Sequence, residues 1–245
     1  MKNLLWRIRR KVGLILKRLF FVNRLDYFIL PVKDINSKWY ITGRSFEIPF
    51  IHRHIDPIGT NRRILEFGCS RSYLALQLVT LGYEVVGVDL RPYPFSHPNL
   101  RFFQMNILDY DDDKCFDYIS SVSTLEHVGL GFYKEERKKS DLYRVTNKLT
   151  KLLKIGGKII ITVPFGIEYE DHFQRSFTYE GILSLFDENK LKLTEKQFFQ
   201  RYQNFRYWKP CSFEKAQTIS NARQNKPGYY GVNCIGCFVW QKIKD

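Results

Sequence analysis

Two histidines in polar segments are the residues best suited to take a proton from a reacting group. His127 lies in "STLEHV", directly after an apolar run, and His172 lies in "YEDHFQR". A histidine has an unperturbed pKa near neutrality, so its neutral ring can act as a general base. Arg175, three residues after His172, could clamp a phosphate or carboxylate. The alternatives are a histidine bound to local backbone at a helix start and a plain solvated loop.

A second set of polar residues directly follows apolar runs. Glu66 lies in "ILEFG", and Asp89 comes 23 residues later, near the end of "EVVGVDL". In nucleotide-binding folds an acid at about this spacing accepts the hydroxyls of a ribose. Asn106 and Asp109 in "NILDYD" could meet the edge of an adenine. Each of these residues could instead be a solvated residue at a strand end.

The loop after Glu66 reads "GCSRS" and holds a single glycine, Gly68. A glycine there permits a positive φ and lets the backbone approach a ligand closely. Nucleotide-binding loops often carry three glycines, and here Ser70 and Ser72 stand at the second and third positions. The loop is therefore either a cofactor loop with fewer glycines or only the end of a strand.

Short apolar runs separated by helical segments must position these residues. Strands are predicted over 62–69, 84–90, 100–106, 116–123, 156–164, 191–199 and 231–242, with helices over 72–81 and about 138–154. Strands that are apolar on both faces indicate a parallel sheet covered on both sides. The sequence thus predicts a doubly wound α/β domain. Its ligands should bind at the carboxyl ends of the strands, where the polar residues above are found.

Five segments, in this order, resemble the class I S-adenosyl-L-methionine (SAM) dependent methyltransferases. They are "ILEFGCSRS", "VVGVDL", "NILDYD", "FDYISSVSTLEHV" and "LLKIGGKIIITVPFG", and the resemblance covers residues 60–165 well and the remainder loosely. Within that superfamily, "LEHV" and "PFG" followed by a His and an Arg resemble small-molecule and glycan enzymes, including those of bacterial cell-surface polysaccharide assembly. The resemblance implies a Rossmann-like sheet of seven mostly parallel strands with an antiparallel last strand.

The resemblance also implies roles for individual residues. The cofactor-binding residues would be Glu66, Gly68, Cys69 and Ser70 at the methionine end, Asp89 at the ribose, Leu90, Asn106, Ile107 and Asp109 around the adenine, and Ser123 after the fourth strand. His127 would be the catalytic base and His172 its runner-up, while Arg175 would hold the acceptor. SAM carries no phosphate, so serines in the loop are tolerable. A domain that no longer binds the cofactor is the alternative.

The first 30 residues predict a basic amphipathic helix. Residues 1–25 hold eight Lys or Arg and no acid, out of a net charge of +14 for the chain, and apolar residues recur at helical spacing between them. Cations break every apolar run before the roughly 20 residues that a membrane span requires, and no cleavage site for a signal peptide follows. We expect a cytoplasmic protein that lies at the inner face of an anionic membrane. A helix packed on the domain and a nucleic-acid contact are the alternatives.

Residues 31–245 are predicted to form one domain. Within it, 31–60 should cover the site, with Trp39, Tyr40 and Arg44 as contributors. The aromatic and basic stretch 200–230 should be a long loop, in which Trp208 and its neighbours could stack on sugar rings or bases. The five cysteines predict free thiols in a reducing compartment. Cys234 and Cys237 have no second pair for a zinc site, so no metal is expected.

These features favour an enzyme that methylates a hydroxyl of a sugar, glycan or other small acceptor, and a lipid-linked acceptor fits the expected membrane surface. The first rival is an RNA methyltransferase. Enzymes that methylate amino groups of nucleic acids usually carry a proline-rich tetrapeptide after the fourth strand, and this chain has "STLE" there. The second rival is a methyltransferase-like scaffold without activity, suggested by Ser70, Ser72 and Asn106.

Overall fold

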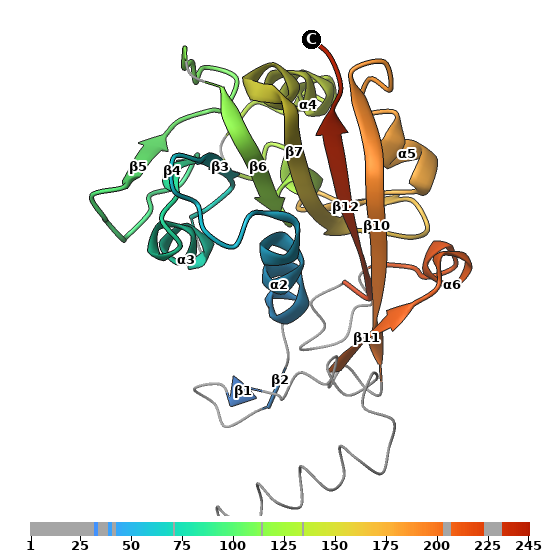
Figure 1. Ribbon diagram of the computed structural model, residues 1–245. Helices are drawn as coiled ribbons and strands as arrows, with labels where there is room; N and C mark the ends of the chain where they lie inside the picture. The colour runs from blue at the N-terminus through green and yellow to red at the C-terminus, as the bar shows by residue number, and fades with distance from the viewer. Residues whose placement is uncertain are drawn as a thin grey trace, which may run out of the picture.

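A computed structural model describes residues 32–33, 39–40, 43–70, 72–113, 115–133, 135–202, 207–222 and 232–245 (Figure 1). The backbone alone is described for residues 32–33, 39–40 and 207. The predicted amphipathic helix, residues 1–30, lies outside the described residues. In the part of the chain that is described, no helix has the length and apolar character needed to cross a membrane.

One mixed sheet forms the centre of the domain. Its strand order is β11-β10-β12-β7-β6-β3-β4-β5. The strands are β3 (Arg63–Phe67), β4 (Glu84–Asp89), β5 (Leu100–Gln104), β6 (Phe116–Val122), β7 (Leu153–Pro164), β10 (Leu191–Tyr202), β11 (Tyr207–Cys211) and β12 (Cys234–Lys242). β3, β4 and β6 are buried almost throughout, which explains why most of their residues are apolar.

The strand directions confirm a mostly parallel sheet with an antiparallel last strand. β5, β4, β3, β6 and β7 pair in parallel, and β12 runs antiparallel to both of its neighbours, β7 and β10. The chain builds outward from β3 to β5 and then crosses back to β6, so the strand order reverses between β3 and β6. A ligand site is expected above the carboxyl ends of the strands at this reversal.

The prediction of seven strands was wrong by one. The stretch 200–230, expected to be a long loop, holds the end of β10, the edge strand β11 and the short helix α6 (Phe213–Gln217). β11 pairs antiparallel with β10, and Pro210 lies opposite Phe199. A proline has no N–H to donate to a neighbouring strand, so it is tolerated at a sheet edge. Its presence in the sequence argues against a strand at this position.

Helices cover both faces of the sheet (Figure 1). α2 (Arg44–His54) and α3 (Leu74–Thr80) pack on one face, where Phe50, Leu74 and Leu78 are fully buried. α4 (Asp141–Leu152), α5 (Tyr179–Leu183) and α6 cover the other face, around an aromatic core that includes Phe238 and Trp240. This arrangement confirms the doubly wound α/β class.

The helices follow the expected sequence signals. In α4, Leu142, Val145 and Leu149 form a buried stripe at helical spacing. Gly82, at φ +92°, follows α3, a backbone conformation that favours glycine. The two helices predicted within the domain correspond to α3 and α4, whose bounds lie within a few residues of the predicted ones, whereas α2, α5 and α6 were not predicted.

Three small elements complete the structure around the carboxyl edge of the sheet. The pair β1 (Val32–Lys33) and β2 (Trp39–Tyr40) precedes α2. The 3-10 helix η2 (Leu125–His127) follows β6. The hairpin of β8 (Tyr169–Glu170) and β9 (Arg175–Ser176) follows β7. All five cysteines are free thiols, and Cys234 and Cys237 are buried in β12.

Candidate active site

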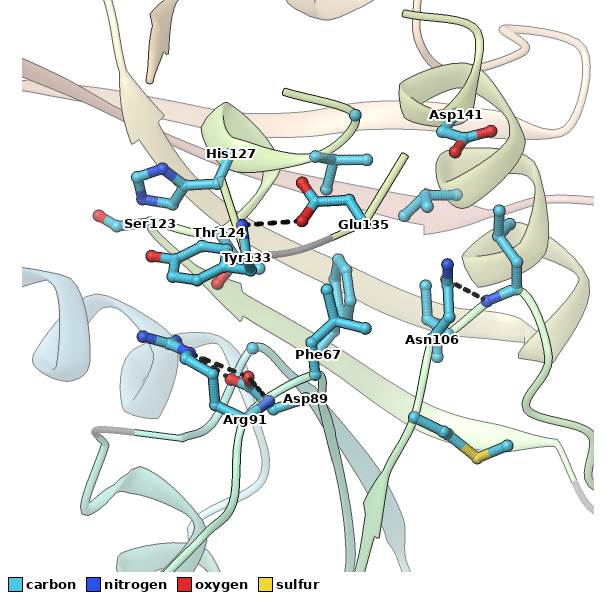
Figure 2. A pocket seen from close by; sticks show the side chains of 18 of the residues that line it. Phe67, Asp89, Arg91, Asn106, Ser123, Thr124, His127, Tyr133, Glu135 and Asp141 are labelled. Atoms are coloured by element: carbon cyan, nitrogen blue, oxygen red, sulfur yellow. Dashed lines mark hydrogen bonds and ion pairs between the residues drawn. The ribbon is translucent and has the colours of Figure 1, made fainter. Parts of the chain in front are cut away.

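A cavity of about 250 Å³ opens at the carboxyl ends of β3, β4, β5 and β6 (Figure 2). Its walls include residues that directly follow each of these strands, together with Arg44 from α2 and Asp141 from α4. Gly68, Asp89, Asn106 and His127, which the sequence singled out, all line it. The structure therefore brings together, at one edge of the sheet, residues that are up to 59 positions apart in the sequence.

The loop after β3 requires glycine at position 68. Gly68 has φ +86°, and a β carbon there would lie 2.1 Å from the side-chain oxygen of Thr124. The Gly68 N–H donates to the carbonyl of Val88 at 2.9 Å, which ties the loop to the end of β4. The backbone of the β3 loop is thus pressed against the segment that follows β6, with no room for any side chain between them.

The serines at the other two glycine positions have structural partners. The Ser70 N–H donates to Asp89 at 2.9 Å, and its hydroxyl donates to the Pro92 carbonyl at 3.3 Å. The Ser72 hydroxyl accepts the N–H of Leu74, the first residue of α3, at 3.0 Å. The two serine hydroxyls therefore hold the loop through hydrogen bonds that glycines could not make.

Asp89 ends β4 with its carboxylate at the cavity. One oxygen, Oδ2, accepts the Ser70 N–H, and the other, Oδ1, accepts the Arg91 N–H at 2.8 Å. The Arg91 guanidinium reaches the same carboxylate and also lies over the ring of Tyr133, 4.5 Å from its centroid. Figure 2 shows Arg91 and Asp89 side by side below Tyr133.

An apolar slot lies between the ends of β4 and β5. Leu90, Met105 and Ile107 line it, together with Phe67 from β3. Asn106 lies in this wall, and its side-chain oxygen accepts the Leu108 N–H at 3.0 Å. That oxygen retains one lone pair, so Asn106 can still accept a hydrogen bond from a ligand.

Ser123 follows β6 in a conformation that is rare for residues other than glycine. Its φ is +47°, and its hydroxyl donates to Glu47 at 2.6 Å. The same Glu47 oxygen accepts the Thr162 hydroxyl at 2.6 Å, and the second oxygen pairs with Arg44 at 3.1 Å. Glu47 is only 2% exposed. One buried carboxylate therefore fastens α2 to the ends of β6 and β7 and holds Arg44 at the cavity.

The position of His127 defines which ring nitrogen can accept a proton. Nδ1 lies 2.5 Å from the carbonyl oxygen of Phe173. A carbonyl only accepts hydrogen bonds, so Nδ1 carries the hydrogen in the neutral ring and Nε2 carries the lone pair. Nε2 lies 3.9 Å from the Glu126 carboxyl. His127 lines the cavity, so its ring can serve a reaction there.

Two buried carboxyls lie behind the cavity wall. Burial raises the pKa of Glu66 to about 7 and that of Glu126 to about 8, and the nearby Glu47 adds to the effect on Glu126. The Oε2 atoms of both residues are buried without a hydrogen-bond partner among the described residues. Arg44 partly offsets both shifts through its positive charge. Each buried carboxyl would gain from a cationic ligand group placed beside it.

Several sequence-predicted site residues lie outside the cavity. Cys69 is fully buried behind the loop, where burial raises the pKa of its thiol. Asp109 and His172 are exposed. Arg175 is buried in the β8–β9 hairpin, where burial lowers the pKa of its guanidinium and Glu170 pairs with it at 3.4 Å.

Trp208 was expected to stack on a ligand and instead belongs to the core. It is 4% exposed and packs against Phe46 of α2, with 5.2 Å between ring centroids. The pairing of β11 with β10 carries this indole onto α2, which a loop would not have done. The side chain of Tyr40 lies outside the described residues.

The structure adds cavity residues that the sequence did not single out. Arg91, Tyr133, Glu135 and Asp141 line the cavity, and Glu47 supports it from α2. The segment "GLGFY", residues 129–133, has no helical or strand period, but it begins with Gly129 and contains Gly131, both at positive φ. Such glycines near a candidate base are the signal that could have marked this loop. In the described part of the chain, no group of His, Cys, Asp or Glu is arranged to hold a metal ion.

Comparison with known proteins places this geometry in context. The family described as "Methyltransferase domain" matches residues 44–218. An uncharacterized methyltransferase of Schizosaccharomyces pombe is 25% identical over 172 residues, which are 66% of this chain and 57% of that protein. A ubiquinone biosynthesis O-methyltransferase of Nitrosococcus oceani is 29% identical over 109 residues, 40% of this chain and 42% of that protein. The chain thus spans about half the length of the curated relatives it matches.

Solved structures share the fold. The 1,6-didemethyltoxoflavin-N1-methyltransferase of Burkholderia thailandensis, crystallised with 1,6-didemethyltoxoflavin and S-adenosylhomocysteine, superposes with a TM-score of 0.54. The match covers 81% of this chain and 77% of that chain at 15% identity. An identity this low establishes the common architecture only.

Proposed function

Because the chain belongs to the methyltransferase domain family, we propose that it transfers the methyl group of SAM to a hydroxyl of a sugar, glycan or other small acceptor. The observation that carries this proposal is the cavity at the carboxyl edge, whose lining includes the apolar slot and Asp89, with the buried Glu66 directly behind its wall. Their chemistry fits an adenine, a ribose and an ammonium group, in the order in which SAM carries these groups.

The methionine end of SAM carries an ammonium and a carboxylate. Glu66 suits the ammonium because its Oε2 is buried without a hydrogen-bond partner among the described residues. Arg44 lines the cavity and is paired with Glu47, and its positive charge suits the carboxylate of SAM. Arg44, expected to contact the acceptor, is thus better suited to the cofactor. Gly68 allows the backbone to approach closely.

The nucleoside end would lie between β4 and β5. Asp89 can accept the ribose hydroxyls, and Leu90 and Ile107 can sandwich a flat base. The Asn106 oxygen can accept a hydrogen bond from the adenine amine through its remaining lone pair. Asp109 is exposed, which leaves Asn106 as the better acceptor.

When bound, SAM would supply an activated methyl group on a positively charged sulfur. The protein then has to orient an acceptor hydroxyl in line with that methyl group and remove its proton. His127 can take the proton on Nε2, since Nδ1 is held by the Phe173 carbonyl. In such a transfer the acceptor hydroxyl would give its proton to Nε2 of His127 and its oxygen would gain the methyl group supplied by SAM, whose sulfur would keep the electron pair of the broken bond.

Calorimetry with SAM and with S-adenosylhomocysteine tests cofactor binding directly. We expect both to bind to the full chain at micromolar to submicromolar concentration, and Asp89→Asn to weaken both. An absence of binding at millimolar concentration would refute the proposal and favour a scaffold role. Comparing extracts of cells that express the wild type or Asp89→Asn would then identify the acceptor as the compound that gains one methyl group only with the wild type. If the compound that gains the methyl group is an RNA, the proposed small acceptor is wrong.

A further inference from the structure

A cluster of aromatic rings adjoins the candidate base. Phe132 lies 4.6 Å from Phe173 and 5.1 Å from Tyr133, measured between ring centroids. The His127 ring lies 4.5 Å from Phe173 and 5.7 Å from Tyr133. Tyr133 lines the cavity, while Phe132 is 45% exposed. The cluster therefore runs without a break from the cavity, past His127, to the protein surface.

The loop that carries Phe132 and Tyr133 is held rigidly. The Glu135 carboxylate accepts the N–H groups of Gly131 and Tyr133 at 2.9 and 2.8 Å. Gly129 has φ +71°, and a β carbon there would lie 2.2 Å from the Lys138 carbonyl oxygen. Figure 2 shows the bond from Glu135 reaching across to this loop beneath His127. These contacts fix the backbone from which the rings of Phe132 and Tyr133 project.

The second loop, which carries Phe173, is fixed in the same way. The Asp171 carboxylate accepts the N–H groups of Phe173 and Gln174 at 2.7 and 2.8 Å. The bond from His127 to the Phe173 carbonyl joins this loop to η2. Two loops from different parts of the chain thus present one continuous aromatic surface around one imidazole.

A single exposed apolar side chain is ordinary on a protein surface. Phe95 is an example, being 37% exposed and packed against Tyr73 and Tyr93 away from the cavity lining. Phe132 differs because its ring is continuous with rings that line the cavity and flank the base. Rigid aromatic rings lose little conformational entropy on binding, so they suit a ligand that is itself flat.

We propose that Phe132, Tyr133 and Phe173 form the acceptor subsite and that the acceptor is a hydroxylated ring with an apolar face. The ring stacks on Phe132, and its reacting hydroxyl is directed at Nε2 of His127. A phenol and the apolar face of a sugar both meet this description, because each offers a flat surface beside a hydroxyl. This acceptor subsite rests on the proposed methyl transfer, and the aromatic rings would determine which class of acceptor binds there.

Ligand-observed NMR by saturation transfer tests the subsite without a known acceptor. The full chain is first loaded with an excess of S-adenosylhomocysteine. Phenol, methyl β-D-glucopyranoside and glycerol are then added in turn at equal millimolar concentration. We expect saturation transfer to at least one ring compound and none to glycerol. A response to phenol alone identifies an aromatic acceptor, and a response to the glucoside alone identifies a sugar.

Two variants make the test specific. Phe132→Ala should lower the signal of the responding ring about fivefold, the size expected for one aromatic stacking partner, while Phe95→Ala should leave it unchanged. S-adenosylhomocysteine affinity and melting temperature should be the same in both variants as in the wild type. If the nucleoside binds and neither ring responds, or if Phe132→Ala responds like the wild type, the subsite is refuted while the methyl transfer stands. If the nucleoside itself fails to bind, the proposed function fails first.

Discussion

Arg91 holds the Asp89 carboxylate from its backbone and its side chain at once. The Arg91 N–H and Nε both reach Oδ1, at 2.8 and 3.2 Å, and Nη2 reaches Oδ2 at 3.3 Å. The Ser70 N–H adds a fourth donor. Four donors match the number of lone-pair sites on a carboxylate. A ribose can therefore reach Asp89 only if a donor yields, and the guanidinium, which is partly exposed, is the one that can move.

Arg91→Ala should leave SAM affinity unchanged or raise it by up to about fivefold. Removing the guanidinium takes away a competitor for Asp89, and a partly exposed ion pair contributes only about 0–1 kcal/mol. Asp89→Asn should weaken SAM by about 1.5–3 kcal/mol, since it removes a hydrogen bond to a charged group. Calorimetry on both variants measures the contrast.

A matched control is Arg101→Ala, whose guanidinium pairs with Glu84 at the opposite end of β4. Its SAM affinity should equal that of the wild type. A tenfold loss of affinity in Arg91→Ala would show that the guanidinium contacts the cofactor, which would overturn the view that it only competes for Asp89.

Glu47→Ala should destabilise the domain more than an ordinary surface change. The substitution leaves the buried Thr162 hydroxyl and the partly buried Ser123 hydroxyl without their acceptor, at a cost of about 1–3 kcal/mol for the buried group and less for the other. For a domain of this size, about 1 kcal/mol corresponds to a shift of roughly 2–4 °C in melting temperature. We expect Glu188→Ala, at an exposed glutamate, to stay within about 0.5 kcal/mol of the wild type. Equal melting temperatures for the two variants would contradict the role assigned to Glu47.

Glu47 also shows where sequence reasoning stops. Its partners Ser123 and Thr162 lie 76 and 115 positions away, so no local pattern connects them. By contrast, Asp89 ends β4 and Gly68 directly follows β3, and both strands are buried and mostly apolar, so a local run of apolar residues marks each site in the sequence. The carboxyl edge of the sheet could thus be predicted from the sequence, whereas the contribution of α2 required the three-dimensional packing.

The same distinction explains the error over Trp208. An indole in a basic and aromatic stretch has the composition of a ligand platform. Its burial depends on Phe46, which lies 162 positions earlier and reaches it only because α2 packs beside the end of β10. The rings of Phe132 and Phe173 have an equally plain sequence context, and only the contact between their loops distinguishes them.

Deleting residues 1–25 should abolish binding to anionic vesicles. Each of the eight cations contributes on the order of 1 kcal/mol near such a surface. Co-sedimentation with vesicles of phosphatidylserine and phosphatidylcholine measures the effect, and vesicles of phosphatidylcholine alone are the control. SAM affinity should survive the deletion. If the shortened chain sediments with anionic vesicles as much as the full chain does, residues 1–25 are not the membrane-binding segment.

His127→Gln should lower kcat about 10²- to 10⁴-fold with little change in SAM affinity, as expected for loss of a general base. The acceptor for this assay is the compound that gains a methyl group in cells. The same substitution at His172, which is exposed and lies outside the cavity lining, should cost less than about tenfold. The reverse order of effects would transfer the role of base to His172.

The tautomer of His127 can be tested without any acceptor. Nitrogen-15 NMR of histidine-labelled protein above pH 8 should show a neutral ring with its hydrogen on Nδ1, because that atom donates to the Phe173 carbonyl. The His127→Gln spectrum assigns the signal by its loss. A hydrogen found on Nε2 would leave this ring unable to accept a proton from the cavity side.

SAM binding should depend on pH through Glu66. Burial raises the pKa of this carboxyl from its ordinary value of 4.5 to about 7, so the folded protein keeps the proton over a range in which the unfolded chain has lost it. The contribution of Glu66 to stability is therefore full below about pH 4.5 and is lost as the pH rises through about 7. An ammonium beside the carboxyl favours its ionised form, so binding below pH 7 should release a proton.

The affinity for SAM should consequently rise between pH 5.5 and about 7.5. Above that range the ligand's own amino group, with an unperturbed pKa of about 7.7–8.0, begins to lose its charge. Calorimetry in two buffers with different ionisation enthalpies counts the protons released at each pH. Glu66→Gln should bind more weakly and release fewer protons, because its amide cannot ionise. If that variant follows the same pH curve as the wild type, another group is the partner of the ammonium, and Glu126, buried with a pKa of about 8, is the next to replace.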